Sequence, residues 1–530
     1  MQKLFVTVAI LALAGCQPAE EPKLAVKPDD FSALVQEPRT AEQLAADIKS
    51  KTVTAEATTR SYLDRIAAVD DAGPMLNAVL ALNPGALEDA RELDAETAKG
   101  TSRGPLHGVP VLLKDNIDTI GMPTTAGSLA LAQNMTGRDS PLVARLRQAG
   151  AVILGKTNLS EWANFRSNSS TSGWSGVGGQ TKNPHVLDRN PCGSSSGSGS
   201  AVAAGLAAFA IGTETDGSIV CPSGANGIVG IKPTVGLVPR TYIVPISATQ
   251  DTAGPMALTV ADAALVLSVI AGSDPSDPST KDADTHKQDY TKALDPNALK
   301  GKRIGVARFL AGYHGPTDAA FDHALEELKA AGAELVEIKE APKGRSEMGA
   351  AEFAVLLAEF KAGVNHYLAS ATAAVKPRSL DDLITFNKET PAELEFFNQD
   401  VFEEAAKAPA LTDKKYLDAK ATAARLAGKE GIDKMLADNN VVAIVAPTGG
   451  PAWMTDLVTG DHFLGASSGY AAVAGYPNIT VPMGEVRDLP VGLSFFGTAW
   501  SEPTLIGLAY AYEQRTKART APQFFAHSPQ

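Results

Sequence analysis

The sequence predicts an α/β protein, organised as a single large domain in which a central mixed sheet is flanked by helices. The chain has 530 residues, of which 44% are hydrophobic and 20% charged, so it is an ordinary globular sequence long enough to bury a large core. Short apolar runs alternate with helical patterns, which is typical of an α/β sandwich around a mostly buried sheet. The length alone would suggest three domains, at roughly 150 residues each, but large α/β enzymes often fold as one.

Two helices open the predicted domain, which spans residues 40–530. Thr40-Ala41-Glu42-Gln43 matches a capping box and predicts a helix through Ile48, and a second helical pattern runs from Ala55 to Val69. The strands predicted after them are Val109–Leu113, Ala151–Leu154, Arg303–Val306, Glu334–Ile338, Val441–Ala446, Asn478–Val481 and Val491–Phe496. The helices predicted among and after these strands are Leu142–Gln148, Asp318–Ala331 and Pro503–Arg515. Residues 346–439 are almost wholly helical in pattern, which predicts an insertion or cap on the sheet.

The N-terminus has the layout of an export signal. Residues 1–15 hold one cation, Lys3, followed by a largely apolar stretch that is too short to span a bilayer. The segment ends in Leu13-Ala14-Gly15-Cys16, which resembles the bacterial lipobox, so Cys16 is expected to be lipidated; the alternative is a plain signal peptide with Cys16 incidental. Residues 16–39 are rich in Pro and charge and are predicted to be a tether. We therefore expect a lipoprotein of the cell envelope, anchored in the periplasm through Cys16.

Charge and cysteine content narrow the possible partners. The formal net charge is −13 and no long Lys/Arg run occurs, which argues against nucleic acid as a ligand. Besides Cys16 the chain has Cys192 and Cys221, and no C-x-x-C pair suggests a zinc or thioredoxin-type site. The sequence leaves open whether these two residues form a disulfide, because the bond needs a particular Cα separation. Our default expectation is two buried free thiols.

The segment from Asn190 to Thr234 carries the strongest chemical signal. It reads NPCGSSSGSGSAVAAGLAAFAIGTETDGSIVCPSGANGIVGIKPT, so a Gly/Ser run passes directly into the apolar stretch Ala201–Ile211. Because such a stretch must be packed, a flexible linker is disfavoured here. A Gly/Ser loop that enters a close-packed helix presents backbone N–H groups and hydroxyls suited to an oxyanion. The second glycine turn, Gly212–Ser218, is predicted to belong to the same site.

A serine nucleophile in this segment needs a base. The eight histidines are scattered among unrelated contexts, and each is better explained as a surface or packing residue. Gly193–Gly197 satisfies the G-x-S-x-G elbow of α/β hydrolases around Ser195, but no strongly apolar strand runs directly into it. No Ser-x-x-Lys motif occurs. Lys114 follows the apolar run Gly108–Leu113. Composition favours an exposed lysine in a loop. If Lys114 is buried instead, its pKa falls and its amine can act as a neutral base.

These motifs resemble the amidase signature family. The shared pattern is a Lys-Asp dipeptide, a Gly/Ser-rich motif and a Gly-x-Asp-x-Gly-Gly-Ser-Ile segment, which correspond here to Lys114-Asp115, Gly193–Ser195 and Gly212–Ile219. The resemblance covers roughly residues 40–515. It implies the family's single-domain fold and a Ser-Ser-Lys triad. The chain departs from the common pattern at Glu214, Asp216 and Val220, and at Cys192 and Ser196, where glycine is frequent; none of these positions removes a catalytic group.

The resemblance also assigns roles to individual residues. Ser218 is expected to be the nucleophile, Ser194 the bridging serine with a cis peptide bond, and Lys114 the base. The oxyanion hole is expected to consist of the backbone N–H groups of Thr215, Asp216, Gly217 and Ser218. Trp162, Asn164 and Arg166 are expected to bind substrate, Asp251 to support a loop, and Lys156 and Lys232 to be structural. No metal or cofactor is expected.

The expected function is that of an exported amidase. NLSEWANFRS, NPCGSSSGS, GTETDGSIVCP and KPTVGLVPR are similar to family members that release ammonia from C-terminal peptide amides, so a peptide amide is the favoured substrate. Aryl or fatty amides are alternatives within the family. A serine esterase centred on Ser195 and a catalytically silent envelope binding protein are possible outside it. The family's transamidating enzyme, which acts on aminoacyl-tRNA, fits poorly with export.

Overall fold

The computed structural model describes residues 31–35 and 37–528. The predicted signal segment, the lipobox with Cys16 and much of the predicted tether lie outside the described residues. Within the part that is described, no helix combines the length and the apolar character needed to cross a membrane.

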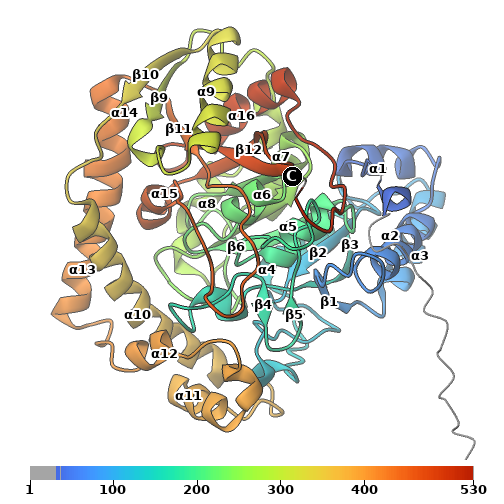
Figure 1. The fold of residues 1–530 in the computed structure, drawn as a ribbon. Coiled ribbons are helices and arrows are strands. Elements are labelled where there is room, and N and C mark those ends of the chain that lie inside the picture. The colour runs from blue at the N-terminus through green and yellow to red at the C-terminus, as the bar shows by residue number, and fades with distance from the viewer. Residues whose placement is uncertain (1–30, 36, 529–530) are drawn as a thin grey trace, which may run out of the picture.

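A mixed sheet of eleven strands runs through the molecule and is flanked by helices, as predicted (Figure 1). Its strand order is β1-β3-β2-β6-β8-β7-β12-β13-β11-β9-β10. The strands are β1 (Val79–Leu82), β2 (Pro110–Lys114), β3 (Val152–Thr157), β6 (Phe209–Glu214), β7 (Val229–Lys232), β8 (Thr252–Ala257), β9 (Arg303–Ala307), β10 (Glu334–Ile338), β11 (Ala443–Pro447), β12 (Asn478–Val486) and β13 (Leu489–Phe496). The short strands β4 (Trp174–Ser175) and β5 (Gly179–Gln180) pair separately.

Parallel and antiparallel pairs alternate in blocks across this sheet. Strand β2 runs parallel to both β3 and β6, and β9 runs parallel to both β10 and β11. The strands between these blocks pair antiparallel. Because β2 and β6 are parallel neighbours, their carboxyl ends meet at one edge of the sheet, where ligands bind in open α/β sheets. Lys114 and Glu214 are the last residues of these two strands.

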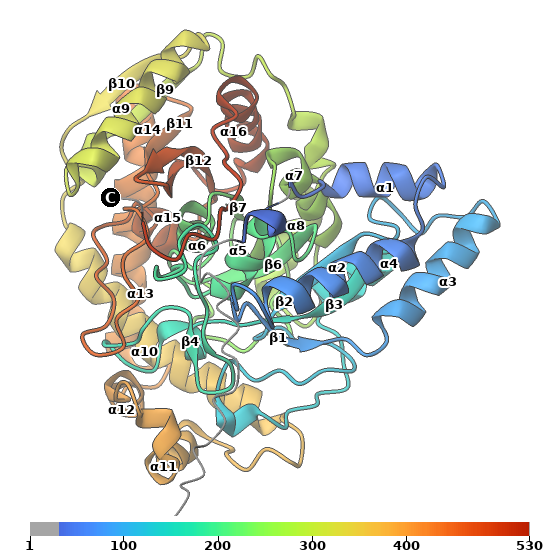
Figure 2. The same ribbon diagram turned by 45° about the vertical axis from the view of Figure 1, so that its right-hand side comes forward.

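Helices cover this sheet at both ends of the molecule (Figure 2). They are α1 (Ala41–Lys49), α2 (Ala55–Val69), α3 (Ala86–Ala98), α4 (Pro141–Gln148), α5 (Ser196–Ala203), α6 (Val220–Ala225), α7 (Val260–Ile270), α8 (Ala283–His286), α9 (Gly315–Ala330), α15 (Gly469–Ala474) and α16 (Glu502–Thr516). The capping box at Thr40 is present, with reciprocal hydrogen bonds to Gln43. The N-terminal helices α1–α3 lie beside the β1–β3 edge, and α9 and α16 lie toward the C-terminal strands (Figure 2).

Residues 345–439 form a segment of helices without strands. They are α10 (Arg345–Ala369), α11 (Leu380–Glu389), α12 (Asp400–Ala405), α13 (Lys414–Ala424) and α14 (Asp433–Asn439), with a π-helical stretch, Arg425–Ile432, between the last two. They run along one side and the lower end of the molecule in Figure 1. A hydrophobic cluster that includes Phe360 and Phe402 of this segment also contains Trp162 and Phe165, so the helices are packed against the loops after β3.

The apolar stretch Ala201–Ile211 is divided between two elements. It contains the end of α5, a turn, and the start of β6, and all of it is buried, as expected of a packed stretch. Strand β6 itself carries Gly212, where an added Cβ would lie 2.9 Å from Ser195 Oγ, and β7 carries Gly230, where it would lie 2.3 Å from Ser223 Oγ. These small residues let α5 and α6 approach the sheet closely. The loop with Ser194, before α5, and the loop with Ser218, before α6, are thereby brought to the ends of β2 and β6.

Candidate active site

Ser194 lies in the turn that leads into α5. The Gly193–Ser194 peptide bond is cis, as the family resemblance implied. A Cβ at residue 193 would lie 2.2 Å from Ser160 Oγ, so only glycine fits there. The Ser194 carbonyl accepts a hydrogen bond from Ser160 N–H at 3.1 Å, and the side chain is fully buried. The hydroxyl of Ser194 is therefore held in the interior, beside the end of β2.

Lys114 is fully buried at the end of β2, not exposed in a loop. Its Nζ lies 2.8 Å from Ser194 Oγ, 2.9 Å from Thr213 Oγ1 and 3.2 Å from the Thr213 carbonyl oxygen. Burial lowers the pKa of Lys114 to about 7, against the opposing charges of Asp251 and Glu214, which are the smaller effects. An amine with this pKa is unprotonated in a large fraction of molecules at neutral pH, as a general base must be.

Ser218 occupies the turn between β6 and α6. Gly217 has φ +82°, a left-handed conformation that glycine adopts without steric cost. The carboxylate of Glu214 accepts hydrogen bonds from the N–H groups of Ile219 at 2.8 Å and Val220 at 3.0 Å, which fixes the start of α6. Ser195 N–H donates to the Ser218 carbonyl at 3.2 Å and so joins the two serine loops.

The turn before Ser218 presents backbone donors. Within the described residues, the N–H groups of Asp216, Gly217 and Ser218 donate to no protein acceptor. Thr215 Oγ1 donates to Asp251 Oδ1 at 2.6 Å, and Asp251 also accepts from the N–H groups of Ile246 and Ser247, both at 2.8 Å. Asp251 therefore supports this turn and a neighbouring loop. Preorganised donors of this kind are suited to stabilising an oxyanion.

Ser195 is not arranged as a nucleophile. Its Oγ donates to the Thr213 carbonyl at 3.1 Å and accepts from Thr213 N–H at 3.2 Å, so it is occupied by the backbone of β6. In the described part of the chain, no histidine is hydrogen-bonded to Ser194, Ser195 or Ser218. The structure therefore gives no support to a Ser-His esterase centred on Ser195.

Trp162, Asn164 and Arg166 follow β3 in a turn with unusual backbone geometry. Trp162, Ala163 and Asn164 have φ values of +49°, +54° and +68°. Asn164 is half-buried and its Oδ1 lies beside Gly193, whereas Trp162 is buried against the edge of the Phe402 ring at a centroid distance of 5.7 Å. Substrate binding by Asn164 and Trp162 stays a prediction.

Arg166 is enclosed by protein. It is fully buried, pairs with Glu161 at 3.0 Å, donates to the Glu393 carbonyl oxygen and lies over the Phe397 ring at 4.1 Å. This arrangement favours a structural role that ties the turn to the helical segment. Lys156 likewise pairs with buried Asp115 at 2.7 Å, and Lys232 donates to the Tyr476 carbonyl at 2.7 Å, which agrees with structural roles.

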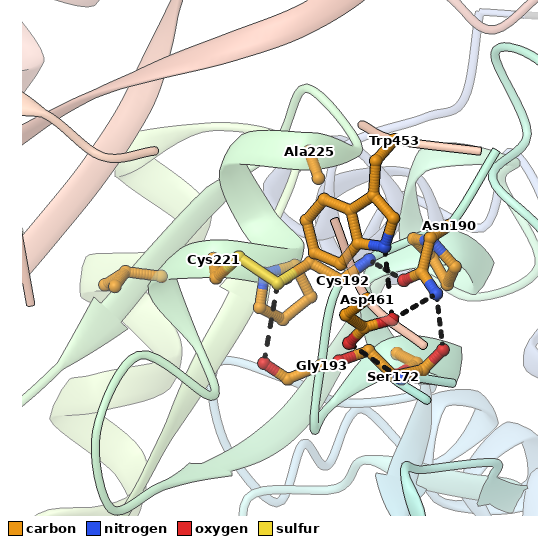
Figure 3. Close-up of a disulfide and its surroundings, with 12 residues drawn as sticks. Ser172, Asn190, Cys192, Gly193, Cys221, Ala225, Trp453 and Asp461 are labelled. Atoms are coloured by element: carbon orange, nitrogen blue, oxygen red, sulfur yellow. Dashed lines mark hydrogen bonds between the residues drawn. A yellow bond between two sulfur atoms is a disulfide. The ribbon is translucent and has the colours of Figure 1, made fainter. Parts of the chain in front are cut away.

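Cys192 and Cys221 form a disulfide, so the expectation of two free thiols is wrong (Figure 3). Their Cα atoms are 6.0 Å apart, within the range that the bond requires. The residues are 29 positions apart in the sequence, and packing of α5 and α6 against neighbouring strands brings them together. Sequence spacing alone contains no information about this approach.

One acidic neighbour of the site could not be found from sequence patterns. Glu352 of α10 accepts a hydrogen bond from Gln250 Nε2 at 3.0 Å, and the same amide reaches the Thr215 carbonyl at 3.4 Å. Burial raises the pKa of Glu352 to about 8, and the negative charge of Asp216 adds to the shift. A helical residue so far from Ser218 in the sequence carries no local signal that it lies here.

A cavity of about 620 Å³ adjoins the site. Its lining includes Asn116, Thr213 and Thr215, and residues 243–246 contribute apolar side chains to it. Asn116 Nδ2 donates to Thr213 Oγ1 at 2.9 Å, which links the cavity wall to the surroundings of Lys114. The described residues include no group of three His, Cys, Asp or Glu side chains placed to hold a metal ion.

Comparisons with known proteins identify the family. The family model described as Amidase matches residues 57–506. The chain is 53% identical to the peptide amidase of Stenotrophomonas maltophilia, whose crystal structure superposes with a TM-score of 0.87 over 92% of this chain and 98% of that one. It is also 40% identical to a probable amidase of Arabidopsis thaliana, over 92% of each chain. The crystal structure of an amidase family protein from Bacillus anthracis is 36% identical and superposes with a TM-score of 0.82, over 91% of this chain and 92% of that one. The chain therefore belongs to the amidase signature family and is a hydrolase of amide bonds.

Proposed function

We propose that this amidase is exported and hydrolyses C-terminal peptide amides, with Ser218 as nucleophile, Ser194 as bridging serine and Lys114 as base. The observation that carries the proposal is the 2.8 Å contact between the buried Lys114 Nζ and Ser194 Oγ. A buried lysine without a carboxylate partner is rare, because the charged form loses its hydration. Its low pKa makes it a proton acceptor at neutral pH.

The neighbours of Lys114 fit a neutral amine. A neutral amine has two N–H donors and one lone pair, and Lys114 Nζ has three neighbours at hydrogen-bond distance. The two acceptors on Thr213 take the two N–H groups. The lone pair is then directed to the hydroxyl proton of Ser194, which is the orientation that proton transfer requires.

Proton transfer would proceed through Ser194. Ser194 gives its proton to Lys114 and takes the proton of Ser218, while Ser218 Oγ forms a bond to the amide carbonyl carbon. The resulting oxyanion is stabilised by the backbone N–H groups at residues 215–218. The relay then returns a proton to the leaving nitrogen, ammonia departs, and water hydrolyses the acyl-enzyme to release the acid and restore Ser218.

The substrate assignment is supported by similarity to solved peptide amidase structures. The relative with 53% identity is a peptide amidase, and a second structure of that enzyme holds the competitive inhibitor chymostatin. Aryl and fatty amides are the alternatives within the family.

Export is supported by the sequence layout of residues 1–15, and the Cys192–Cys221 disulfide fits an oxidising compartment. Lipidation of Cys16 and anchoring in the cell envelope are parts of the same proposal.

The substrate proposal is tested by ammonia release. Purified enzyme is assayed against blocked peptide amides, aryl amides and fatty amides, together with Ser218→Ala. We expect release from peptide amides that is lost in the variant. Release from aryl or fatty amides alone would overturn the substrate assignment but keep the triad. Full activity of Ser218→Ala would overturn the assigned nucleophile.

Export and lipidation need a separate test. The chain is expressed in a bacterium with and without Cys16→Ser, and the membrane and soluble fractions of the envelope are assayed. We expect the parent protein to carry lipid at Cys16 and to sediment with membranes, whereas the variant does not. Recovery of unprocessed parent protein from the cytosol would contradict this part of the proposal.

A further inference from the structure

The disulfide joins the two loops that carry the proposed catalytic serines. Cys192 lies two residues before Ser194, and Cys221 lies three residues after Ser218. Cys221 belongs to the first turn of α6, which has only six residues and begins two residues after Ser218. The cross-link therefore restrains the backbone that determines the distance between the Ser194 and Ser218 hydroxyls.

The backbone at Cys192 is suited to glycine. Its φ is +58°, in the left-handed region, where a residue with a Cβ is under steric strain and glycine is not. Cys192 therefore places a side chain on a backbone conformation that is unfavourable for residues with a Cβ. The contribution of that side chain is the bond to Cys221.

The residues just before Ser194 are already held by polar contacts of Asn190 and Cys192 (Figure 3). Asn190 accepts from Cys192 N–H at 2.8 Å and donates to the Ser172 carbonyl at 2.7 Å. Asp461 accepts from Ser172 N–H at 3.0 Å and from Trp453 Nε1 at 3.1 Å. These contacts fix the loop to its neighbours on one side, but they do not reach α6.

Besides packing of α5 against α6, two hydrogen bonds join the loop to α6 and its flanks. Ser195 N–H donates to the Ser218 carbonyl at 3.2 Å, and Asn226 Nδ2, after the end of α6, donates to the Pro191 carbonyl at 2.9 Å. The first is a single long hydrogen bond and the second acts at the far end of the helix. The covalent link between them restrains the first turn of α6 more tightly than either contact.

We propose that the Cys192–Cys221 disulfide is a positioning clamp that holds Ser194 at the distance from Ser218 needed for proton transfer, so that its reduction lowers turnover. The inference rests on the proposed roles of the two serines. Reduction by dithiothreitol transfers two electrons and two protons to the bridge, breaks the S–S bond, leaves two thiols and converts the reductant into its cyclic disulfide. No reacting group is lost.

The test requires such a reagent to reach the bridge. Cys192 is 4% exposed and Cys221 is half-buried, so the bridge is not sealed in the deep core, and titration of the released thiols shows whether the reductant has reached it. The clamp would make full activity depend on an oxidising compartment. An enzyme made in the cytosol, where thiols stay reduced, would be slow even when folded.

The clamp is tested by reducing the folded enzyme. The full chain with Cys16→Ser is used, so that Cys192 and Cys221 are the only cysteines. The probe is the amide that the oxidised enzyme turns over fastest; kcat, KM, the thermal midpoint and the number of thiols are measured before and after dithiothreitol. Because a misplacement of about 1 Å can cost roughly 100-fold, we expect a fall in kcat of about tenfold, with KM changed less than about twofold. Reoxidation should restore kcat.

Variants separate the clamp from a general loss of stability. The double variant Cys192→Ser/Cys221→Ser should have low kcat and no response to dithiothreitol. Cys192→Gly relieves the left-handed backbone but removes the bridge, and it should also be slow. If these variants fail to fold, chemical reduction of the folded parent remains the test.

Two results would overturn the clamp. One is an enzyme with two titrated thiols and unchanged kcat; the other is a lower thermal midpoint with unchanged kcat at room temperature, which would make the bridge merely stabilising. Ser218→Ala in the oxidised state distinguishes this failure from failure of the proposed function. If that variant is inactive and reduction has no effect, only the clamp is wrong.

Discussion

The strand ends around Lys114 and the helical segment 345–439 contribute to the site in different ways. The first region supplies all three proposed reacting groups from two parallel strands and the turns beside them. The second supplies carboxyl groups that reach in from outside. Glu352 approaches the turn at residues 215–218, here called the oxyanion turn, through Gln250, and Glu359 accepts from Ser247 and Thr249. The proposed reacting groups thus come from motifs at the ends of neighbouring strands, whereas part of their environment comes from a segment distant in sequence. Substitutions in the two regions should therefore have different consequences.

The largest effect is expected for the bridging serine. Ser194→Ala removes the hydroxyl that would carry the proton from Ser218 to Lys114, so kcat/KM should fall by about 1,000-fold, as for other members of catalytic triads. Ser195→Ala is the matched control, because its hydroxyl is bonded to the Thr213 backbone and outside the relay. Steady-state kinetics of both variants decide the matter. A larger loss in Ser195→Ala than in Ser194→Ala would reverse the assignment.

The pH profile should show the titration of Lys114. The base must be neutral, and burial lowers its pKa to about 7, so kcat/KM should rise with pH up to about 7 and then stay level until about pH 8, where Glu352 begins to ionise. Well below the pKa of Lys114, the rate should drop about tenfold per pH unit. Rates at constant ionic strength with a substrate that does not titrate test this directly. A flat profile between about pH 5 and 9 would contradict a lysine base.

Glu352 should limit the rate on the alkaline side. Its pKa is raised to about 8, so above that pH it becomes a carboxylate near Asp216 and the oxyanion turn, and a developing negative charge is disfavoured there. We expect kcat to decline severalfold between about pH 8 and 10 in the parent and to stay level in Glu352→Gln. Glu347→Gln, exposed on the same helix, is the control. A decline that persists in Glu352→Gln would assign it to another group.

Glu359 should matter for stability more than for turnover. Its carboxylate is buried and accepts hydrogen bonds from Ser247, Thr249 and Tyr416. Glu359→Gln replaces an acceptor oxygen with a donor and should lower the free energy of unfolding by about 2 kcal/mol. Chemical denaturation of this variant and of Glu347→Gln provides the comparison. Equal stability of the two variants would show that the helical segment is not anchored through this carboxylate.

The smallest effect is expected at the surface of the helical segment. Arg425 pairs with Glu430 at 2.6 Å, and both side chains are exposed. Exposed pairs contribute little because water and salt screen them, so Arg425→Ala should change the free energy of unfolding by less than about 0.5 kcal/mol and leave kcat unchanged. Denaturation curves and kinetics check both values. A change in kcat would mean that the segment transmits surface changes to the turn at Ser218.

Much of the fold could be predicted from local patterns. The strand Glu334–Ile338 has the predicted bounds, and the strand predicted to begin at Asn478 and the helix predicted at Pro503–Arg515 differ from the structure only in where they end or begin. Strands β6, β7 and β8 were not predicted. Strand β8 (TAGPMA) consists mostly of Gly, Ala and Pro, and β7 (VGIK) has only four residues. Strand β6 (FAIGTE) continues an Ala-rich stretch, so no alternation of polar and apolar residues separates it from α5. Because α5 and α6 pack closely on these strands, small residues are needed there, and the large alternating apolar side chains that usually indicate a strand are missing.

The proposed reacting groups and the turns that hold them could be inferred from the amino-acid sequence. The spacing of Lys114, Ser194 and Ser218 within recognisable motifs indicated the family, because a turn with its glycines and hydroxyls is encoded by a few consecutive residues. The burial of Lys114, the enclosure of Arg166 by Glu161 and the pairing of Cys192 with Cys221 could be seen only in the folded chain. Burial and pairing depend on which distant segments meet. That outcome follows from packing of the whole chain, since a side chain's environment is made largely of residues far from it in sequence.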